Sequence, residues 1–563
     1  MNIKKIISVI LSLALVFCLF AGCAPTNEMA IKAPELSDLA TSGIYSKITN
    51  IWINANAQYN EVPLNSALDG SEKNLKNLVK DFAAKADGSE DVSSAIGEAI
   101  AAIGTAEGYI HLNTGLYKLS ADVTVPENVT LSFAPGAVIS VDAGVTLTID
   151  SKKIYAPLAK IFEGDGTVAR MKNIEFGYPQ WFGAVIGDEK GDSDAFQKAI
   201  NCVDTVYLIS GVYEIEKTVV IPQGRNISII GQGQFNLSHL YISAPIAFSY
   251  LREAGSAKTD LYITGVFFKS DNANTAVSFH GVEGAADSSL KITNFIYHGL
   301  HTLVDMSYAT GCEFADSRGV LTKYSFVFGK QCNDVVFGSF LSLSGGSFLV
   351  ADGGDVNDGN SRGITFLNTC SVWAYASDVI IKNYSDISIK QGGYDLGCNQ
   401  YPGTDNRAAI VLDGVKNVLF EGNWIATCPD APYSAKEFRD GILITGGSEN
   451  VKILGNSIVN NRIGVNVDNG TDVNANIEII GNKGEGNFQH DFYLANSNGV
   501  KLNYNFCFSY RWRGIPHEIS GGGNLKNIEV IGNSLGNSEY DLVSQIGLTD
   551  SFKCEHNLFK VST

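Results

Sequence analysis

The phrase NVLFEGN, at residues 417–423, recurs as NVKILGN at 450–456, NIEIIGN at 476–482 and NIEVIGN at 527–533. Two weaker copies, GVKLNYN and SFKCEHN, begin at Gly499 and Ser551. In each strong copy the second and fourth positions are apolar, which is the period of a strand with one buried face. The Gly-Asn pair that closes the phrase favours a tight turn.

Weaker forms of the phrase can be traced back to Gly231, in steps of roughly 22 to 34 residues, which is the period range of solenoid repeats. No helical pattern of useful length lies between the copies, which argues against βαβ units. We therefore predict an all-β solenoid of about 12–13 coils, with parallel strands laid in register. We expect the closing Asn side chains of the last coils to stack as a structural amide ladder.

The first residues read as an export signal. Lys4 and Lys5 precede the apolar run 6–20, which is too short to span a membrane and ends in Phe20-Ala21-Gly22-Cys23. Small residues before a cysteine are similar to the bacterial lipoprotein signal, although Phe20 stands where Leu is more typical. We predict a signal peptide at 1–23, lipidation of Cys23 and attachment to the cell surface through the lipid anchor, with simple secretion as the alternative.

Residues 24–45 read as a tether, and 46–180 as a small α+β capping region with a first β-helix-like unit. Within it, Leu75, Leu78, Val79 and Phe82 share one helical face, as do Ile96, Ala99, Ile100 and Ile103. The passage that begins Gly115-Leu116-Tyr117 recurs as Gly211-Val212-Tyr213 after a second helical pattern. Because the open end of a solenoid exposes its core, such capping units are expected. We assign 181–563 to the β-helix proper.

Composition limits the partners. The formal net charge of −18 repels nucleic acid, so an anionic ligand would need a local basic patch. None of the cysteines has zinc-ligand spacing; we expect most to be buried thiols, with a disulfide between Cys398 and Cys428 as an alternative. No cofactor is required. Calcium is an alternative at the oxygen-rich loop 352–360, although its spacing fits no EF-hand and favours a solvated turn.

The start of this region carries a specific set of short motifs: Trp181-Phe182-Gly183-Ala184, Gly187-Asp188, the run Asp192–Ile200, Val206-Tyr207-Leu208 and Gly211-Val212-Tyr213. In these residues the chain resembles the pectate-lyase-like superfamily of right-handed parallel β-helices. The acidic run is looser than in the family, and Ser210 replaces a proline. The resemblance covers about residues 180–232 and implies a right-handed β-helix. It implies no single activity, because the fold carries lyases, hydrolases, epimerases, tailspikes and adhesins.

The family's catalytic motifs do not carry over. His280-Gly281 and Tyr297-His298-Gly299 lack the paired Asp residues of polygalacturonases, and the Arg-x-Pro-x-x-Arg pattern of pectate lyases is absent. Candidate residues must therefore come from the repeat itself.

A basic column is the main functional signal. If the second strands of the late coils are aligned, the residues just before them are Arg407, Arg439, Arg462, His490 and His517. Coils stack about 4.8 Å apart, so these side chains would form a cationic stripe roughly 20 Å long that suits a carboxylated or sulfated polymer. Charged residues at strand starts are also common surface features, and surface ion pairs contribute little to stability.

Acidic and aromatic residues accompany the column. Asp440 and Asp491 are the candidate acids, and Tyr401, Trp424, Tyr433 and Tyr493 the candidate sugar-binding aromatics, together with Arg407. A lyase needs a base, here His490, His517 or an unprotonated Lys or Tyr, and a cation for the uronate carboxylate, here Arg439 and Arg462. A hydrolase instead needs two carboxylates, here Asp440 and Asp491. We predict cleavage of an acidic polysaccharide by β-elimination; the alternatives are a glycoside hydrolase and a non-catalytic polysaccharide-binding adhesin.

Overall fold

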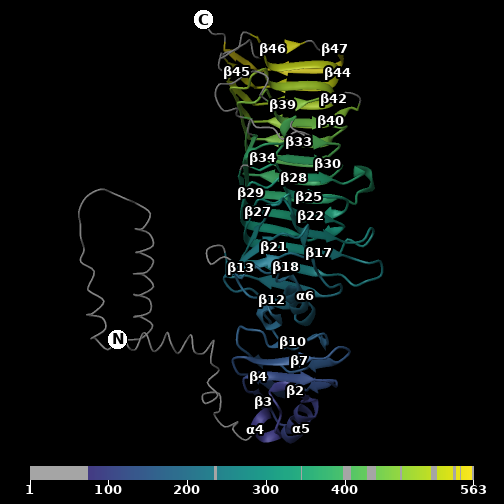
Figure 1. The fold of residues 1–563 in the computed structure, drawn as a ribbon. Coiled ribbons are helices and arrows are strands. Elements are labelled where there is room, and N and C mark those ends of the chain that lie inside the picture. The colour runs from purple at the N-terminus through teal and green to yellow at the C-terminus, as the bar shows by residue number, and fades with distance from the viewer. Residues whose placement is uncertain are drawn as a thin grey trace, which may run out of the picture. The chain divides into compact units, whose positions relative to one another are not determined.

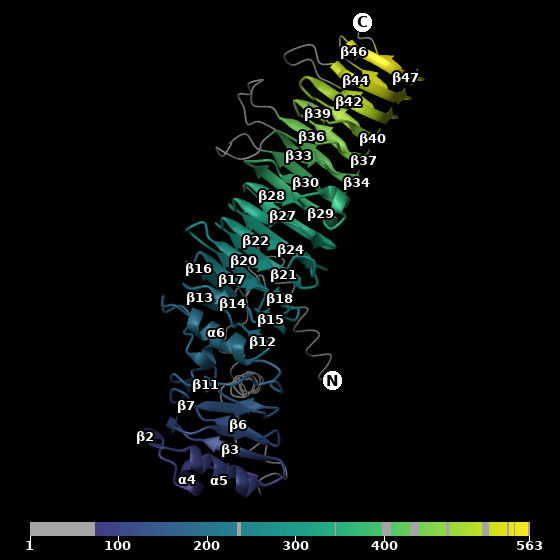
Figure 2. The ribbon, with the colours of Figure 1, turned by 90° about the vertical axis from the view of Figure 1, so that its right-hand side faces the viewer.

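The computed structural model describes residues 74–233, 238–343, 345–396, 407–427, 439–468, 472–508, 517–536, 540–544 and 547–560. These residues form a right-handed parallel β-helix, as predicted. It has about 15 turns, more than the 12–13 expected, because the region before residue 181 contributes turns of its own. Figures 1 and 2 show the strands of successive turns stacked above one another. No helix in these ranges is both long and apolar enough to cross a membrane.

Each turn from residue 205 onwards contributes to three sheets, because strands pair with the strands of the turns before and after. Sheet 1 contains β12 (Thr205–Tyr207), β15 (Asn226–Ile230), β18 (Asp260–Thr264), β31 (Ser385–Lys390), β34 (Lys416–Glu421), β37 (Glu449–Leu454), β40 (Asn474–Ile480) and β47 (Gly547–Glu555). Sheet 2 contains β13 (Gly211–Ile215), β16 (Ser238–Ile242), β19 (Val266–Lys269), β32 (Gly393–Leu396), β35 (Trp424–Ala426), β38 (Ser457–Val459), β41 (Lys483–Glu485), β43 (Phe506–Phe508), β45 (Ser534–Gly536) and β48 (Leu558–Lys560).

Sheet 3 contains β14 (Val219–Val220), β17 (Ile246–Leu251), β20 (Thr275–His280), β22 (Thr302–Ser307), β25 (Tyr324–Phe328), β28 (Ser347–Asp352), β30 (Val379–Lys382), β33 (Ala408–Asp413), β36 (Asp440–Thr445), β39 (Ile463–Val467) and β46 (Tyr540–Ser544). Some long strands continue from one sheet into the next. Four run from sheet 1 into sheet 2: β21 (Ser289–His298), β24 (Glu313–Val320), β27 (Val335–Leu343) and β29 (Arg362–Ala374). Two run from sheet 3 into sheet 1: β42 (His490–Asn503) and β44 (His517–Ile531). β23 (Ala309–Thr310) pairs with β26 (Cys332–Asn333). The three sheets enclose one continuous apolar core.

Residues 74–168 contain parallel turns of their own. The first of their sheets contains β1 (Leu75–Asn77), β3 (Gly108–Leu112), β6 (Val129–Phe133) and β9 (Ile154–Tyr155). The second contains β2 (Asp87–Asp91), β4 (Gly115–Leu119), β7 (Ala137–Val141) and β10 (Phe162–Glu163). The third contains β5 (Val123–Val125), β8 (Thr146–Ile149) and β11 (Thr167–Val168). The helices are α4 (Leu78–Phe82), α5 (Ser93–Ile103) and α6 (Ser193–Cys202), with short 3₁₀ segments η2 (Pro179–Phe182) and η3 (Val356–Asp358). α5 buries Ile96, Ala99 and Ile103 against the first turns, which suits a cap.

The repeated phrase explains the corner between sheets 1 and 2. Its glycine adopts a left-handed backbone, with φ of 67° at Gly422 and 60° at Gly455, a conformation that costs glycine little. The next residue, Asn, points inward, and these side chains form the predicted ladder: Asn423, Asn456, Asn482, Asn505, Asn533 and Asn557. Each rung also donates to a main-chain carbonyl, as Asn482 Nδ2 does to Ile453 O at 2.8 Å. The ladder therefore satisfies polar groups that the turn would otherwise bury unpaired.

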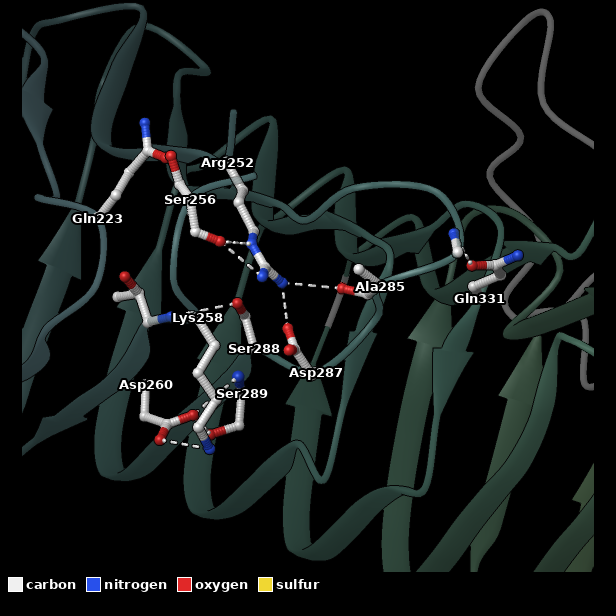
Figure 3. A network of polar contacts seen from close by, with 12 residues as sticks. Gln223, Arg252, Ser256, Lys258, Asp260, Ala285, Asp287, Ser288, Ser289 and Gln331 are labelled. Carbon is white, nitrogen blue, oxygen red and sulfur yellow. Dashed lines mark hydrogen bonds and ion pairs between the residues drawn. The ribbon is translucent and has the colours of Figure 1, made fainter. Parts of the chain in front are cut away.

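The connections between sheets 3 and 1 in the earlier turns are held by side chains. Arg252 donates to the carbonyl oxygens of Ser256 and Ala285, at 2.8 and 2.9 Å, and forms an ion pair with Asp287 (Figure 3). Its side chain is largely buried, so this arginine joins the connections of two successive turns. The described cysteines are free thiols, and four of them are buried.

Candidate functional site

Three of the predicted cations lie one above another at the corner where sheet 2 passes to sheet 3. The backbone amide of Asp440 donates to the carbonyl oxygen of Arg407 at 3.1 Å, and the backbone amide of Arg462 donates to the carbonyl oxygen of Arg439 at 2.6 Å. Arg407, Arg439 and Arg462 therefore start sheet 3 in three successive turns. Arg407 is exposed, and the other two are half-buried.

The column does not continue as predicted. His490 pairs with Ile463 and not with Arg462, and His517 pairs with His490. The residue that follows Arg462 along the corner is Gln489, whose amide donates to the Arg462 carbonyl at 2.8 Å. The prediction of five stacked basic residues was therefore wrong: between Arg462 and His490 the register differs from the predicted one by one residue. The observed register pairs Phe492 with Val465 and keeps it in the core. The predicted register would have turned that phenylalanine outward.

Arg462 is fixed by a buried carboxylate. Its Nε and Nη2 donate to Asp440 Oδ1 and Oδ2 at 2.7 and 2.8 Å, a bidentate pair. Asn466 Nδ2 donates to the same Oδ2 at 2.8 Å. The Asp440 side chain is 2% exposed, whereas that of Arg462 is 41% exposed. The Asp440 carboxylate raises the pKa of the Arg462 guanidinium, so this group presents a permanent positive charge in a defined orientation.

The outer face of sheet 3 changes from apolar to polar at these turns. A column of paired residues is apolar through Val350, Ile380, Val411 and Leu443, and then becomes Asn466 and Tyr493. The Tyr493 ring lies 5.7 Å from that of His490, centroid to centroid. Arg462, Asn466, His490 and Tyr493 thus occupy the neighbouring strands β39 and β42 and their starts. Asn466 was missed from the sequence, although the alternation in Ile463–Val467 places it on the outer face.

Asp491 does not belong to this group. It is fully buried on the interior side of the strand, where Asn487 donates to it at 2.5 Å and Cys507 contacts it. A side chain at Gly484 would collide with its carboxyl oxygen, which accounts for the glycine there. Burial raises the pKa of Asp491 to about 7. The prediction of Asp440 and Asp491 as a catalytic pair was therefore wrong, since one lies on the outer face and the other inside.

The predicted aromatics are dispersed. Trp424 is 42% exposed but begins β35 of sheet 2, where it pairs with Gly393 and Ser457, so it does not accompany the arginines. Tyr401 and Tyr433, like Cys398, Cys428 and Cys23, lie outside the described residues. For His517 only the backbone, in β44, is described.

The oxygen-rich loop 352–360 and two cavities are separate features of the described part of the chain. Asp352 accepts from the amide of Gly354 at 3.0 Å and Asp355 from that of Asn357 at 2.9 Å, so both carboxylates serve the turn. In the described ranges, no three His, Cys, Asp or Glu residues are grouped as metal ligands. Two cavities, of about 220 and 460 Å³, lie beside α6 and η2, far along the chain from the arginines.

No protein-family model matches the chain, and no curated protein sequence matches it. Among solved structures, the chain is similar to the catalytic unit of a GH87 α-1,3-glucanase from Streptomyces thermodiastaticus, with 11% identity over 67% of this chain and 71% of that one, and a TM-score of 0.49. The AlgE6 A-module, a mannuronan C-5 epimerase of Azotobacter vinelandii, aligns with 15% identity over 86% and 100% of the two chains (TM-score 0.31). The Streptococcus pneumoniae surface adhesin PfbA aligns with 11% identity over 68% and 97% (TM-score 0.40).

The strand pairing itself defines the class of protein: a right-handed parallel β-helix. The activities named above are those of the similar proteins.

Proposed function

We propose that this chain binds an acidic, uronate-containing polysaccharide on the outer face of sheet 3 in its last turns and cleaves it by β-elimination. One observation carries the proposal. An arginine held by a buried carboxylate stands beside an amide, an imidazole and a phenol, all on two adjacent strands. β-Elimination requires these kinds of group: a cation for the carboxylate, a base and an acid.

The roles follow from the chemistry of each group. Arg462 would neutralise the uronate carboxylate and so stabilise the negative charge that develops when the C5 proton leaves. Asn466 would help to hold Asp440, and through it Arg462, in place. His490, in its neutral form, would accept that proton. The electron pair of the C5–H bond forms the C4–C5 double bond as the C4–O bond breaks. Tyr493 would donate a proton to the departing oxygen.

Hydrolysis is less well supported. A glycosidase of the usual kind places two carboxyl groups on opposite sides of one glycosidic bond. Asp440 accepts three hydrogen bonds from Arg462 and Asn466 and lies almost wholly out of solvent, so it is a poor proton donor or nucleophile.

Binding without cleavage is the second candidate. The arginines extend over three turns, whereas the candidate base and acid occur only at one end of this column. A surface whose main task is to hold an anionic polymer would have this distribution of charge.

We also propose that the chain is exported and anchored through a lipid on Cys23, on the strength of the residues around that cysteine. Radiolabelled palmitate should enter the wild-type chain in a bacterial host and not the Cys23→Ala variant. Equal labelling of both would contradict lipidation at this residue.

The cleavage proposal is tested with the chain from residue 24 onwards and a panel of uronate-containing and neutral polysaccharides, with and without calcium. We expect ultraviolet absorbance from unsaturated uronate to rise together with reducing ends. Reducing ends alone would indicate a hydrolase. Binding to the polymer with neither signal would favour the non-catalytic candidate.

A further inference from the structure

Trp373 combines an unusual backbone with an unusual exposure. Its φ is 58°, in the left-handed region, and its side chain is 61% exposed. The neighbouring turn residues with the same backbone, Asn368 and Asn383, carry the short polar side chain that tolerates it. A bulky aromatic residue in this conformation costs free energy, which points to a role for the ring that the fold does not require.

A register shift holds the indole outward. Ser371 pairs with Tyr394 and Ala374 with Leu396, so the chain departs from regular pairing between these residues. Such irregularities re-aim side chains and are common beside functional sites. Val372 and Ala374 flank Trp373, and Ala374 is buried, so the strand itself remains anchored to the core.

The position of Trp373 relates it to the arginines. It lies where β29 leaves sheet 2 and before β30 enters sheet 3, which is the same corner that Arg407, Arg439 and Arg462 occupy in the next three turns. At about 4.8 Å per turn, Trp373 stands roughly 5 Å from the level of Arg407 and roughly 14 Å from that of Arg462. A polymer bound along this corner would therefore reach both the indole and the proposed reaction centre.

Earlier turns also carry exposed apolar and basic side chains at this corner. Leu321, two turns before Trp373, has φ of 54° and is 51% exposed at the same corner. Lys323 Nζ lies 5.2 Å from the centre of the Tyr324 ring, and His301 packs against that ring from the turn before. Apolar surface and positive charge thus flank Trp373 on one side, and arginines flank it on the other.

We propose that Trp373 is a stacking platform for one sugar ring of the acidic polysaccharide, a binding subsite about three turns from the reaction centre. The proposal rests on the function proposed above. The flat indole offers an apolar face to the C–H side of a pyranose, while Lys323 and Arg407 attract the carboxylates of neighbouring units. The occupant is thus an anionic oligosaccharide several units long.

The test compares Trp373→Ala with Tyr504→Ala, a matched exposed aromatic residue with a left-handed backbone between β42 and β43. Affinity for a purified uronate oligosaccharide of at least six units is measured by calorimetry, and kcat and KM on the polymer are measured in parallel. We expect Trp373→Ala to weaken affinity and raise KM by about tenfold, with kcat retained, and Tyr504→Ala to change neither. A disaccharide should bind both variants and the wild type alike, because it is too short to reach from Arg462 to Trp373.

A second variant separates function from folding. Trp373→Gly removes the ring and relieves the left-handed backbone, so its melting temperature should equal or exceed that of the wild type while affinity still falls. If the wild type cleaves the polymer but Trp373→Ala binds and turns over unchanged, the subsite is refuted and the proposed function stands. If the wild type neither binds nor cleaves any uronate polymer, the proposed function fails and the subsite with it. A shift from dimer to monomer on substitution, with binding unaltered, would assign the indole to a protein contact and also overturn the subsite.

Discussion

Asp440 determines how Arg462 is presented. A buried carboxylate with three hydrogen bonds orients the guanidinium, and an ion pair of this kind is more sensitive to the loss of one partner than an exposed pair. The remaining exposed edge of Arg462 is the part available to a substrate carboxylate. The pair therefore links a structural interaction to the proposed chemistry.

Asp440→Asn should lower kcat/KM on a uronate polymer by roughly 10- to 100-fold, because the amide cannot accept both guanidinium hydrogen bonds or balance the charge. The control is Glu421→Gln, which removes an exposed ion pair with Lys390 on sheet 1 and should leave kcat/KM unchanged. Equal activities of all three proteins would contradict the positioning role.

The raised pKa of Asp491 predicts how the stability of the protein depends on pH. Its folded-state pKa, about 7, is above the ordinary value of 3.8, so between these values the folded chain holds a proton that the unfolded chain has released. Its contribution to stability is complete below about pH 4 and is lost as pH rises to about 7, a change on the order of a few kcal/mol. Asp491→Asn should therefore raise the melting temperature relative to wild type at pH 8 but not at pH 4. A difference independent of pH would contradict this reasoning.

At the scale of the element, the repeated phrase builds two stacks of asparagine that differ in burial. The closing residues form the buried ladder, whereas the openers Asn417, Asn450 and Asn476 form an exposed one, with Asn450 Nδ2 donating to Asn417 Oδ1 at 3.2 Å. The openers have positive φ, 57° at Asn450, so their main role is to tolerate the turn.

Asn482→Ala should lower the free energy of unfolding by about 3 kcal/mol, because it leaves buried groups of Asn456 and Ile453 without their partners. Asn450→Gly, in the exposed stack, should be nearly neutral, since glycine adopts the same backbone without strain. Denaturant unfolding of both variants measures the difference. Similar losses in the two would show that burial of the ladder is unimportant.

Some features of these strands and turns could be predicted from the sequence, and others could not. The apolar alternation in Val451 and Ile453 and the Gly-Asn closure predicted the parallel sheet and the ladder, because both features depend on local pattern. The sheet to which Trp424 belongs and the pairing of His490 were not predictable in the same way, since they depend on how many residues turn each corner. The candidate site was therefore found only in part: its arginines align, but Asn466 and Trp373 emerged from the structure.

At the scale of the whole molecule, the turns differ in the side chains that fill their core. The middle turns share a dense cluster of aromatic side chains: Phe314, Phe326, Phe337, Phe340, Phe348 and Phe366. Neighbouring rings there lie 4.6 to 5.9 Å apart, centroid to centroid. The core side chains described in the later turns are mostly aliphatic, with Phe420 and Phe492 among them, and the amide ladder stacks beside them. A terminal turn has a neighbour on one side only.

Amide hydrogen exchange should therefore be slowest in β24, β27 and β29 and become faster toward β44 and β47. Mass spectrometry of exchange in peptides from each turn provides the measurement. Uniform protection from β24 to β47 would indicate that the solenoid opens as one cooperative unit.

The central claim is that the outer face of sheet 3 performs β-elimination. The most direct measurement is the initial rate at which unsaturated uronate ends appear when the wild-type chain, Arg462→Ala and Glu421→Gln act on the same acidic polysaccharide. We expect a rising ultraviolet signal for the wild type and Glu421→Gln, and no signal above background for a folded Arg462→Ala. A fully active Arg462→Ala, or a folded wild type that releases no unsaturated ends from any uronate polymer, would contradict it.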